Sequence, residues 1–442
     1  MRERGAVLLL CLAQFVDVLG VTVAVVGLPE IGRGLGGSGA ATQWVVSGYA
    51  LLFGGFLVPA GRLGDRFGHR RTFLGGVAAF AVASLAAGLA PTLLVVIVAR
   101  AAQGLAAAFV VPSAFALVLA LTEEGRERVR AVGWWTATAA AGGAAGFLCG
   151  GVLVQALGWR AVFLVNVPIC VLVLVLAPRR LAGRGDGGGP RVPLDLPGAS
   201  LVTCGLLAGI AGLSGVLPVV LAPVAVLLLG AFVLVELRSP NPLVPGRLVG
   251  SARFRSALVA AFALTCATTP ASVAGTAFFQ TAQGLPAGLT GVLFAPFSAG
   301  VVVGGTAATR LLDRRRTRPV AAGGFGVVVT ALLLGTLAVA MGSTVLFTVA
   351  LAGAGFGLGA ASVAATSAGT EVVGDEHRGI ASGLLNTAPQ LGSAIGTAVV
   401  GVVALNTVPP ELTAGLLVAA GVAIAGTLAT AGLGDRVPQP RP

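Results

Sequence analysis

The sequence is poor in charge. Only 10% of its 442 residues are charged, and lysine is absent, so that every basic residue apart from two histidines is an arginine. A soluble globular protein carries roughly 25% charged residues, and a chain of this length would need a large polar surface. Because 56% of the residues are hydrophobic, the chain cannot form that surface. The composition excludes a soluble enzyme and a disordered protein, and it predicts an integral membrane protein.

Groups that bind metals or form disulfides are also scarce. The five cysteines lie in apolar stretches and the two histidines are far apart, which excludes a secreted disulfide scaffold and predicts no metal site. A P-loop needs a lysine, so an ATP-driven pump is excluded. A membrane enzyme would need clustered acids, histidines or a Ser/Lys pair inside the spans, and the sequence offers none. We therefore expect no enzyme activity and no cofactor.

The apolar stretches are continuous and about twenty residues long, which is the length of a transmembrane helix. A transmembrane β-barrel would instead show short alternating segments. The stretch 196–235 carries no charge and is too long for one span, and Leu217-Pro218 marks a turn within it. It is predicted to be a helical hairpin in the bilayer. The fourteen predicted spans are 6–28, 42–60, 72–90, 92–121, 131–156, 161–177, 196–215, 217–236, 256–280, 287–308, 319–340, 343–368, 379–404 and 412–433.

The arginines test this layout. If the N-terminus is cytoplasmic, 25 of the 28 arginines fall in cytoplasmic segments, and only Arg33 and Arg160 lie in outer loops. Arg100 alone lies within a span. This is the distribution that the positive-inside rule describes, and it places both termini in the cytoplasm. It also explains the net charge of +12 by membrane topology, so no nucleic-acid partner is expected.

An internal repeat divides the chain into two halves. The pattern R-L-x-D-R begins at Arg62 and again at Arg310, at equivalent positions once the central hairpin is set aside. Two six-helix halves around a site near the membrane midplane are a transporter architecture. The predicted domains are a six-helix bundle over 1–177, cytoplasmic linkers at 178–255 that flank the hairpin at about 196–236, and a second six-helix bundle over 256–442.

The segment GRLGDRFGHRR at 61–71 resembles motif A of the major facilitator superfamily. Residues 100–104 look like motif B of that family, and residues 146–151 look like motif C, which marks antiporters. Further stretches resemble signatures of its fourteen-helix drug:proton antiporter branch, at 22–29, 159–168, 280–296 and 386–396. The chain departs from the pattern at Gly20, where the branch has an acid; Asp17 lies one turn earlier.

The resemblance implies an all-α, major-facilitator-type fold of fourteen transmembrane helices. It implies a proton-coupled exporter of hydrophobic or cationic small organic molecules, that is, drug or antibiotic efflux by alternating access. Such a protein would be a multi-pass monomer of the bacterial cytoplasmic membrane, driven by the proton gradient. A proton-coupled uptake permease and a narrow-specificity metabolite exporter of the same fold remain alternatives.

Asp17 and Arg100 are the acid and the base that lie clearly within spans. Asp17 lies about 16 Å from the start of its span at 1.5 Å per residue, near the bilayer midplane. A charge at that depth is costly and is a functional hypothesis by default. We expect Asp17 to carry the coupled proton and Arg100 to pair with it or to compete with it; the alternative is a static ion pair.

The motif A loop is predicted to be a gate. Its glycines allow close packing, Asp65 can cap a facing helix, and its arginines can pair with acids at the end of the fourth span. Topology alone is the alternative explanation of the arginines. The loop residues and their expected partners are Gly61, Gly64, Asp65, Arg66, Gly68, Arg70 and Arg71, with Glu123, Glu124 and Glu127.

Small residues in the fifth span predict a tight helix contact or, by resemblance to motif C, a hinge. These residues are Gly142, Gly146, Gly150 and Gly151. A set of polar side chains within the spans are candidates for the substrate cavity: Thr22, Gln103, Gln280, Asn386 and Gln390.

Overall fold

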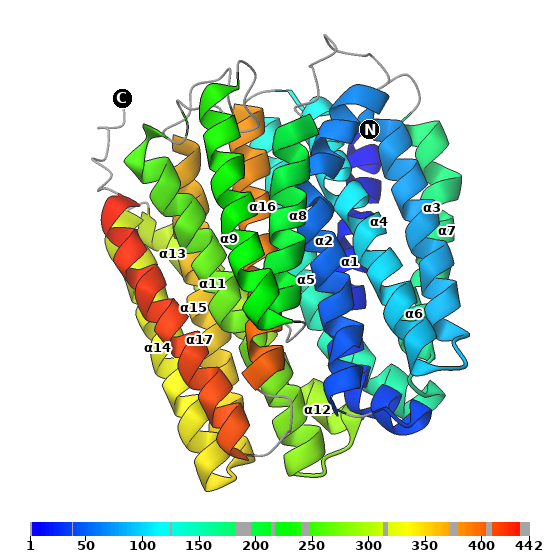
Figure 1. Cartoon of the computed structure of the whole chain (residues 1–442), viewed down its shortest axis with the longest axis vertical. Helices are drawn as coiled ribbons and strands as arrows, with labels where there is room; N and C mark the ends of the chain where they lie inside the picture. Colours follow the sequence, from blue (N-terminus) through cyan, green and yellow to red (C-terminus); the bar gives the residue numbers. More distant parts are fainter. Residues whose placement is uncertain are drawn as a thin grey trace. The chain divides into compact units, whose positions relative to one another are not determined.

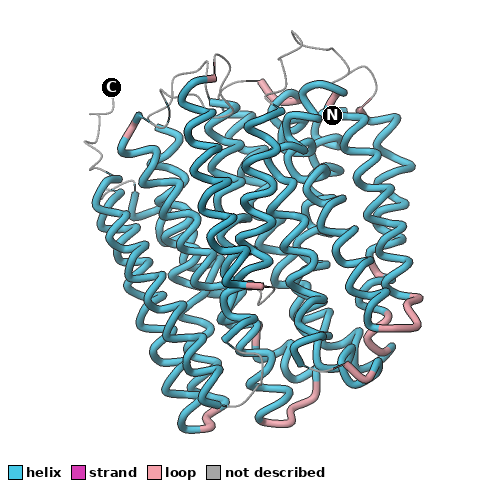
Figure 2. Tube along the Cα trace, viewed as in Figure 1, coloured by secondary structure: helices cyan, strands magenta, loops and turns pink. Residues whose placement is uncertain are grey.

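The structure, a computed structural model, is built from α-helices, and no strand occurs in the residues that it describes. Those residues are 2–37, 39–123, 126–181, 196–213, 217–239, 248, 250–312, 317–371, 378–403 and 409–433. Within each of the two units described below, Figures 1 and 2 show long helices that run alongside one another. The all-helical class predicted from the apolar stretches is confirmed.

The chain forms two compact units. The first comprises Met1–Leu243 together with Pro286–Val292, and the second comprises Val244–Leu285 and Leu293–Pro442. The helices of the first unit are α1 (Arg2–Leu35), α2 (Gly39–Phe67), α3 (His69–Gly88), α4 (Leu93–Ala120), α5 (Arg126–Leu157), α6 (Ala161–Leu164), α7 (Asn166–Arg180), α8 (Leu196–Leu213) and α9 (Pro218–Arg238), with α12 (Ala287–Leu293) through Val292.

The second unit contains α11 (Ala252–Ala277), a π-helical turn (Phe278–Ala282), α13 (Ala295–Leu312), α14 (Thr317–Met341), α15 (Thr344–Glu371), α16 (Arg378–Val403), α17 (Pro409–Ala429) and a 3-10 turn (Thr430–Leu433).

Each predicted span coincides with one of these helices or with two consecutive ones. Among the described residues, 11 helices are long and apolar enough to cross a membrane, and α2 makes 12 if its two segments form one span. The two segments of α2 meet at an angle of 54° next to Pro59, where the ring removes a helical hydrogen bond. The apolar part of α8, Pro197–Gly212, is shorter than the rest.

Glycines bring α5 against α1. A methyl group at Gly142 would lie 2.8 Å from the Phe15 carbonyl oxygen, and one at Gly150 would lie 3.1 Å from Cα of Val23. A methyl group at Gly146 would overlap the Thr22 hydroxyl. The three glycines are spaced by four residues, so they line one face of α5 and let two backbones meet. The close contact predicted from this glycine row is present.

The neighbouring face of α5 contacts α12, within the first unit. A Cβ at Gly151 would overlap the carbonyl oxygen of Ala287, and one at Gly291 would overlap the carbonyl oxygen of Phe147. Because glycine stands on both sides of this contact, α5 is packed closely along two faces.

Glycines also bring helices of the second unit into close backbone contact. Gly355 and Gly359 of α15 face the backbone of α13 at Phe297 and Val301. On α16, Gly392 faces the Phe262 carbonyl oxygen of α11. Without a hydrophobic driving force between helices in lipid, such contacts hold the bundle by van der Waals packing.

The α1–α5 contact leads us to expect different stabilities for two glycine-to-alanine variants of α5. Gly142→Ala places a methyl group against the Phe15 backbone and should lower stability by about 1–3 kcal/mol, whereas Gly143→Ala meets only Val18 Cγ1 at 3.8 Å and should be neutral or mildly stabilising. The melting temperature of the purified protein in detergent is the measurement. Equal melting temperatures for the two variants would contradict the close contact.

Candidate functional site

Asp17 lies inside the first unit and is held by a tyrosine. Its side chain is 5% exposed on α1, and the Tyr49 hydroxyl of α2 donates a hydrogen bond of 2.5 Å to Oδ1. Tyr49 is the only tyrosine in the chain and is itself buried. A hydrogen bond to a buried carboxylate is among the stronger ones, because the dielectric is low and the acceptor is charged.

Arg100 is fully buried on α4 and belongs to a separate hydrogen-bond chain. Its Nε donates to the Val45 carbonyl oxygen at 3.0 Å, and Nη1 donates to Gln103 Oε1 at 3.0 Å. The Gln103 amide then donates to Ser84 Oγ at 2.6 Å. Gln103, predicted to line the substrate cavity, is buried and engaged with this arginine.

The sequence left open whether Asp17 and Arg100 pair, and in the structure they are connected only through Tyr49. Asp17 and Arg100 make no direct ion pair; Tyr49 lies between them, with its hydroxyl on Asp17 and its ring 4.4 Å below the Arg100 guanidinium. This cation–π contact places positive charge near the acid without a direct bond. Sequence reasoning missed Tyr49 and Ser84. A single tyrosine inside a span was the signal that could have found the first.

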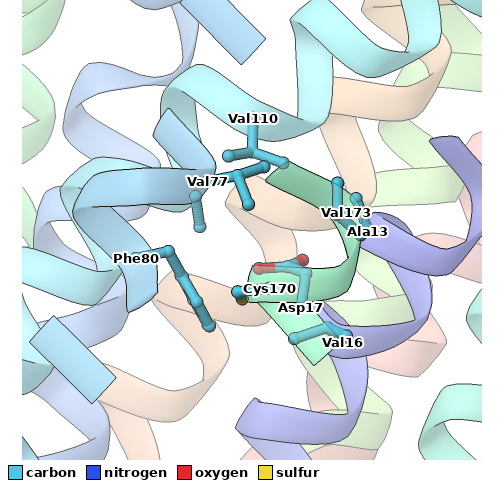
Figure 3. Close-up of a pocket in the computed structure, with 9 residues that line it drawn as sticks. Ala13, Val16, Asp17, Val77, Phe80, Val110, Cys170 and Val173 are labelled. Atoms are coloured by element: carbon cyan, nitrogen blue, oxygen red, sulfur yellow. The ribbon is translucent and has the colours of Figure 1, made fainter. Parts of the chain in front are cut away.

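The Asp17 carboxylate points into a small cavity (Figure 3). The volume is about 20 Å³, and the lining comes from α1, α3, α4 and α7. Apart from Asp17 and Cys170 the lining is apolar: Ala13, Val16, Val77, Phe80, Ala107, Val110 and Val173. A space of this size admits about one water molecule and is too small for an organic substrate.

Thr22 lies away from that cavity. Its hydroxyl donates to the carbonyl oxygens of Val18 and Leu19 in its own helix, at 3.0 and 3.1 Å, and it faces Gly146 of α5. In this structure the residue is part of the α1–α5 contact, where its hydroxyl is already satisfied.

The motif A residues form the tight turn between α2 and α3. Gly68 has a φ of 93°, which side chains rarely adopt, so glycine is required there. A Cβ at Gly64 would lie 2.6 Å from His69 Nδ1, which shows how closely the turn folds back. A Cβ at Gly61 would meet Pro112 at an ordinary 3.9 Å. The predicted need for glycine is met at Gly68 and Gly64.

The charged residues of this turn have local partners. Asp65 lies 2.9 Å from His69 Nε2, and Arg70 donates to the Pro178 carbonyl oxygen at 3.2 Å. The Arg66 guanidinium lies 5.7 Å from the Phe67 ring. Glu123 and Glu127 are exposed and make no ion pair with Arg66 or Arg71 among the described residues; Glu124 lies outside them. The latch between these groups stays a prediction.

The second unit contributes polar groups without charge. Gln280 is 7% exposed on the π-helical turn, a distortion often found at functional sites, and Asn386 and Gln390 are half-buried on α16. Thr265 donates to the Pro389 carbonyl oxygen at 2.7 Å. Residues 256–277 and 379–403 contain no acidic or basic side chain. No cluster that could hold a metal occurs in the described part of the chain.

The sequence was compared with protein families and with known proteins. Residues 10–397 fit the family described as the Major Facilitator Superfamily. The chain is 39% identical to the cephamycin export protein CmcT of Amycolatopsis lactamdurans, over 89% of this chain and 83% of that protein. It is 36% identical to the puromycin resistance protein pur8 of Streptomyces alboniger, over 96% and 85%.

A third relative, the multidrug resistance protein Stp of Mycobacterium tuberculosis, is 34% identical over 88% of this chain and 72% of that protein. Among solved structures, a bacterial homologue of the human lysosomal transporter Spinster aligns with a TM-score of 0.65 and 16% identity, and 98% of each chain is covered. At that identity the structural likeness speaks for the fold alone.

The contact between Tyr49 and Asp17 can be measured by a double-mutant cycle. Tyr49→Phe leaves a buried carboxylate without its donor and should cost about 1.5–3 kcal/mol, but it should cost little in an Asp17→Leu background. Unfolding in mixed micelles gives these free energies. As a control, Arg33→Gln removes the exposed 2.8 Å pair with Glu30 and should cost under about 0.5 kcal/mol. Equal costs of Tyr49→Phe in both backgrounds would refute the coupling.

Proposed function

This chain belongs to the major facilitator superfamily of membrane transporters, and we propose that it is a proton-coupled exporter of hydrophobic or cationic small organic molecules. The observation that carries the proposal is the buried Asp17 carboxyl with its Tyr49 donor. Of the 16 acidic residues in the chain, Asp17 is the one that lies deep within a predicted span. A carboxyl group there has two protonation states that differ strongly in energy.

Gain and loss of one proton would change the surroundings of Asp17. The anion accepts from Tyr49 and lies near the Arg100 charge, whereas the neutral acid needs neither partner. If one facing state favours the anion and the other favours the neutral acid, the proton biases the equilibrium between them. Coupling then requires only that the exported molecule bind the two states unequally.

The substrate class follows from the side chains available. A mostly apolar interior suits hydrophobic molecules, and one acid can serve a proton or a cation in turn. The uncharged polar groups of α11, its π-helical turn and α16 offer hydrogen bonds without charge. We expect neither a cofactor nor a metal to take part, since the proton gradient supplies the energy.

Export is favoured over uptake by two observations. The fifth span carries the motif C glycines, and the relatives are named for antibiotic export or resistance. A narrow-specificity exporter is the second candidate, because two of those relatives are named for a single antibiotic, cephamycin and puromycin.

The membrane arrangement is also part of the proposal. Fourteen spans, both termini in the cytoplasm and a monomer in the bacterial cytoplasmic membrane agree with the arginine distribution. In this arrangement the motif A turn is cytoplasmic, where its charged residues could hold one facing state. The α8–α9 hairpin then crosses the bilayer twice.

Asp17→Asn tests the coupling. Inside-out vesicles are loaded with protons, and lumen pH is followed by dye quenching while lipophilic cations and antibiotics are added. We expect proton release with wild type and none with Asp17→Asn, because the amide cannot carry the proton. Glu30→Gln, which changes an acid at the far end of α1, is the matched control and should behave as wild type. Release that survives Asp17→Asn would move the proton site elsewhere.

A reporter insertion tests the fourteen-span arrangement. Alkaline phosphatase is active only outside the cytoplasm, and we expect activity when it is inserted after Leu217, between α8 and α9. An insertion after Phe67, in the motif A turn, should be inactive. Inactivity at both positions would leave the hairpin on the cytoplasmic side and reduce the count to twelve spans.

A further inference from the structure

Asn166 is a buried amide without partners. It is 1% exposed at the start of α7, and neither Nδ2 nor Oδ1 has a hydrogen-bond partner in the described part of the structure. A buried polar group with no partner costs free energy, so such a group calls for a ligand or an ordered water molecule. Nothing in the mechanism proposed above uses this residue.

The amide lies one turn along α1 from Asp17. A Cβ built on Gly20 would be 3.3 Å from Asn166 Nδ2 and 3.7 Å from Oδ1. Gly20 follows Asp17 by three residues, a rise of about 4.5 Å along the same face of the helix. Because Gly20 has no side chain, the amide packs directly against the backbone of α1 at this turn.

The Asp17 cavity and the Asn166 amide share neighbouring residues. Phe80 lines that cavity and also lies 3.6 Å from the Cβ position of Gly20, and Cys170, four residues after Asn166 on α7, lines it too. The same two helices, α3 and α7, therefore border both the amide and the acid. In Figure 3 the Asp17 carboxylate points between Phe80, Val77 and Cys170.

We propose that Asn166 binds a water molecule and holds it against the Asp17 carboxyl. The volume of about 20 Å³ fits one water molecule and excludes an organic substrate. A buried water needs two to four polar partners, and the amide Nδ2, the amide Oδ1 and the carboxylate supply three. Asn166 is thus a positioning residue for proton exchange, and this rests on the proton coupling proposed above.

The water would take part in a simple proton transfer. A hydronium ion at the site donates its proton to the Asp17 carboxylate, and the products are a neutral water molecule and a neutral carboxylic acid. The reverse transfer regenerates the anion. The other titratable or charged groups facing Asp17 are Tyr49 on α2, Cys170 on α7 and, through the Tyr49 ring, Arg100 on α4. Tyr49 and Arg100 are in contact with each other, which leaves the Cys170 thiol and the proposed water as the groups that can exchange a proton with Asp17.

The test uses two readouts and a matched pair of variants. Asn166→Val keeps the size and removes the polar atoms, whereas Asn166→Ser keeps a group that can hold water. The first readout is substrate-driven proton release in inside-out vesicles as a function of pH. The second is the rate at which methyl methanethiosulfonate modifies Cys170, in a chain whose Cys11, Cys149, Cys204 and Cys266 are replaced by Ala. A thiol reacts as the thiolate, so its rate reports water beside it.

We expect both readouts to fall about tenfold in Asn166→Val, with substrate binding unchanged, and to recover in Asn166→Ser. Wild-type proton release and wild-type Cys170 reactivity in Asn166→Val would overturn the proposal. If the unmodified chain releases no protons, proton coupling fails, but the Cys170 rate still decides whether Asn166 holds water. A Cys170 rate that Asn166→Val leaves unchanged would then overturn it.

Discussion

The hydrogen bond from Tyr49 to Asp17 is the interaction on which the first unit depends. A carboxylate buried among apolar helices is stabilised by a hydrogen-bond donor and by a nearby positive charge. Here the donor comes from α2, and the positive charge of α4 lies over the ring of that same tyrosine, so Tyr49 connects three helices. Arg100 therefore stays near the acid without a direct ion pair. If Asp17 is the proton site, a direct ion pair would favour its anionic state.

The sequence predicted the positions of the helices better than it predicted which helices are neighbours. Runs of apolar residues predicted where the helices lie, and glycine spacing predicted a close contact of α5, without its partner α1, and the tight turn at Gly68. Depth along a helix does not say which way a side chain points. Thr22 was therefore expected at the cavity but faces Gly146, and Gln103 is engaged with Arg100. Asn166 was not predicted as a site residue, because a sequence does not show that a buried amide has no hydrogen-bond partner among the described residues.

The two units carry different chemistry. Charge deep within the predicted spans is confined to the first unit, at Asp17 and Arg100, whereas the corresponding helices of the second offer hydroxyl and amide groups. If the proposed proton coupling holds, a proton-dependent change would begin in the first unit, and the second unit would bind the exported molecule without competing for the proton. Close glycine contacts between helices occur in both units.

The position of the acid explains why the amide is free to bind water. The resemblance to drug:proton antiporters places an acid where this chain has Gly20, and a side chain there would fill the space beside Asn166. With the carboxyl one turn away at Asp17, Phe80 borders both the Gly20 position and the cavity that the carboxylate faces. In the proposed arrangement, a water molecule would restore the hydrogen bonds that the amide lacks and would reach the carboxyl one turn away. The glycine and the displaced acid would then belong to one arrangement, in which proton exchange at Asp17 depends on a residue of α7.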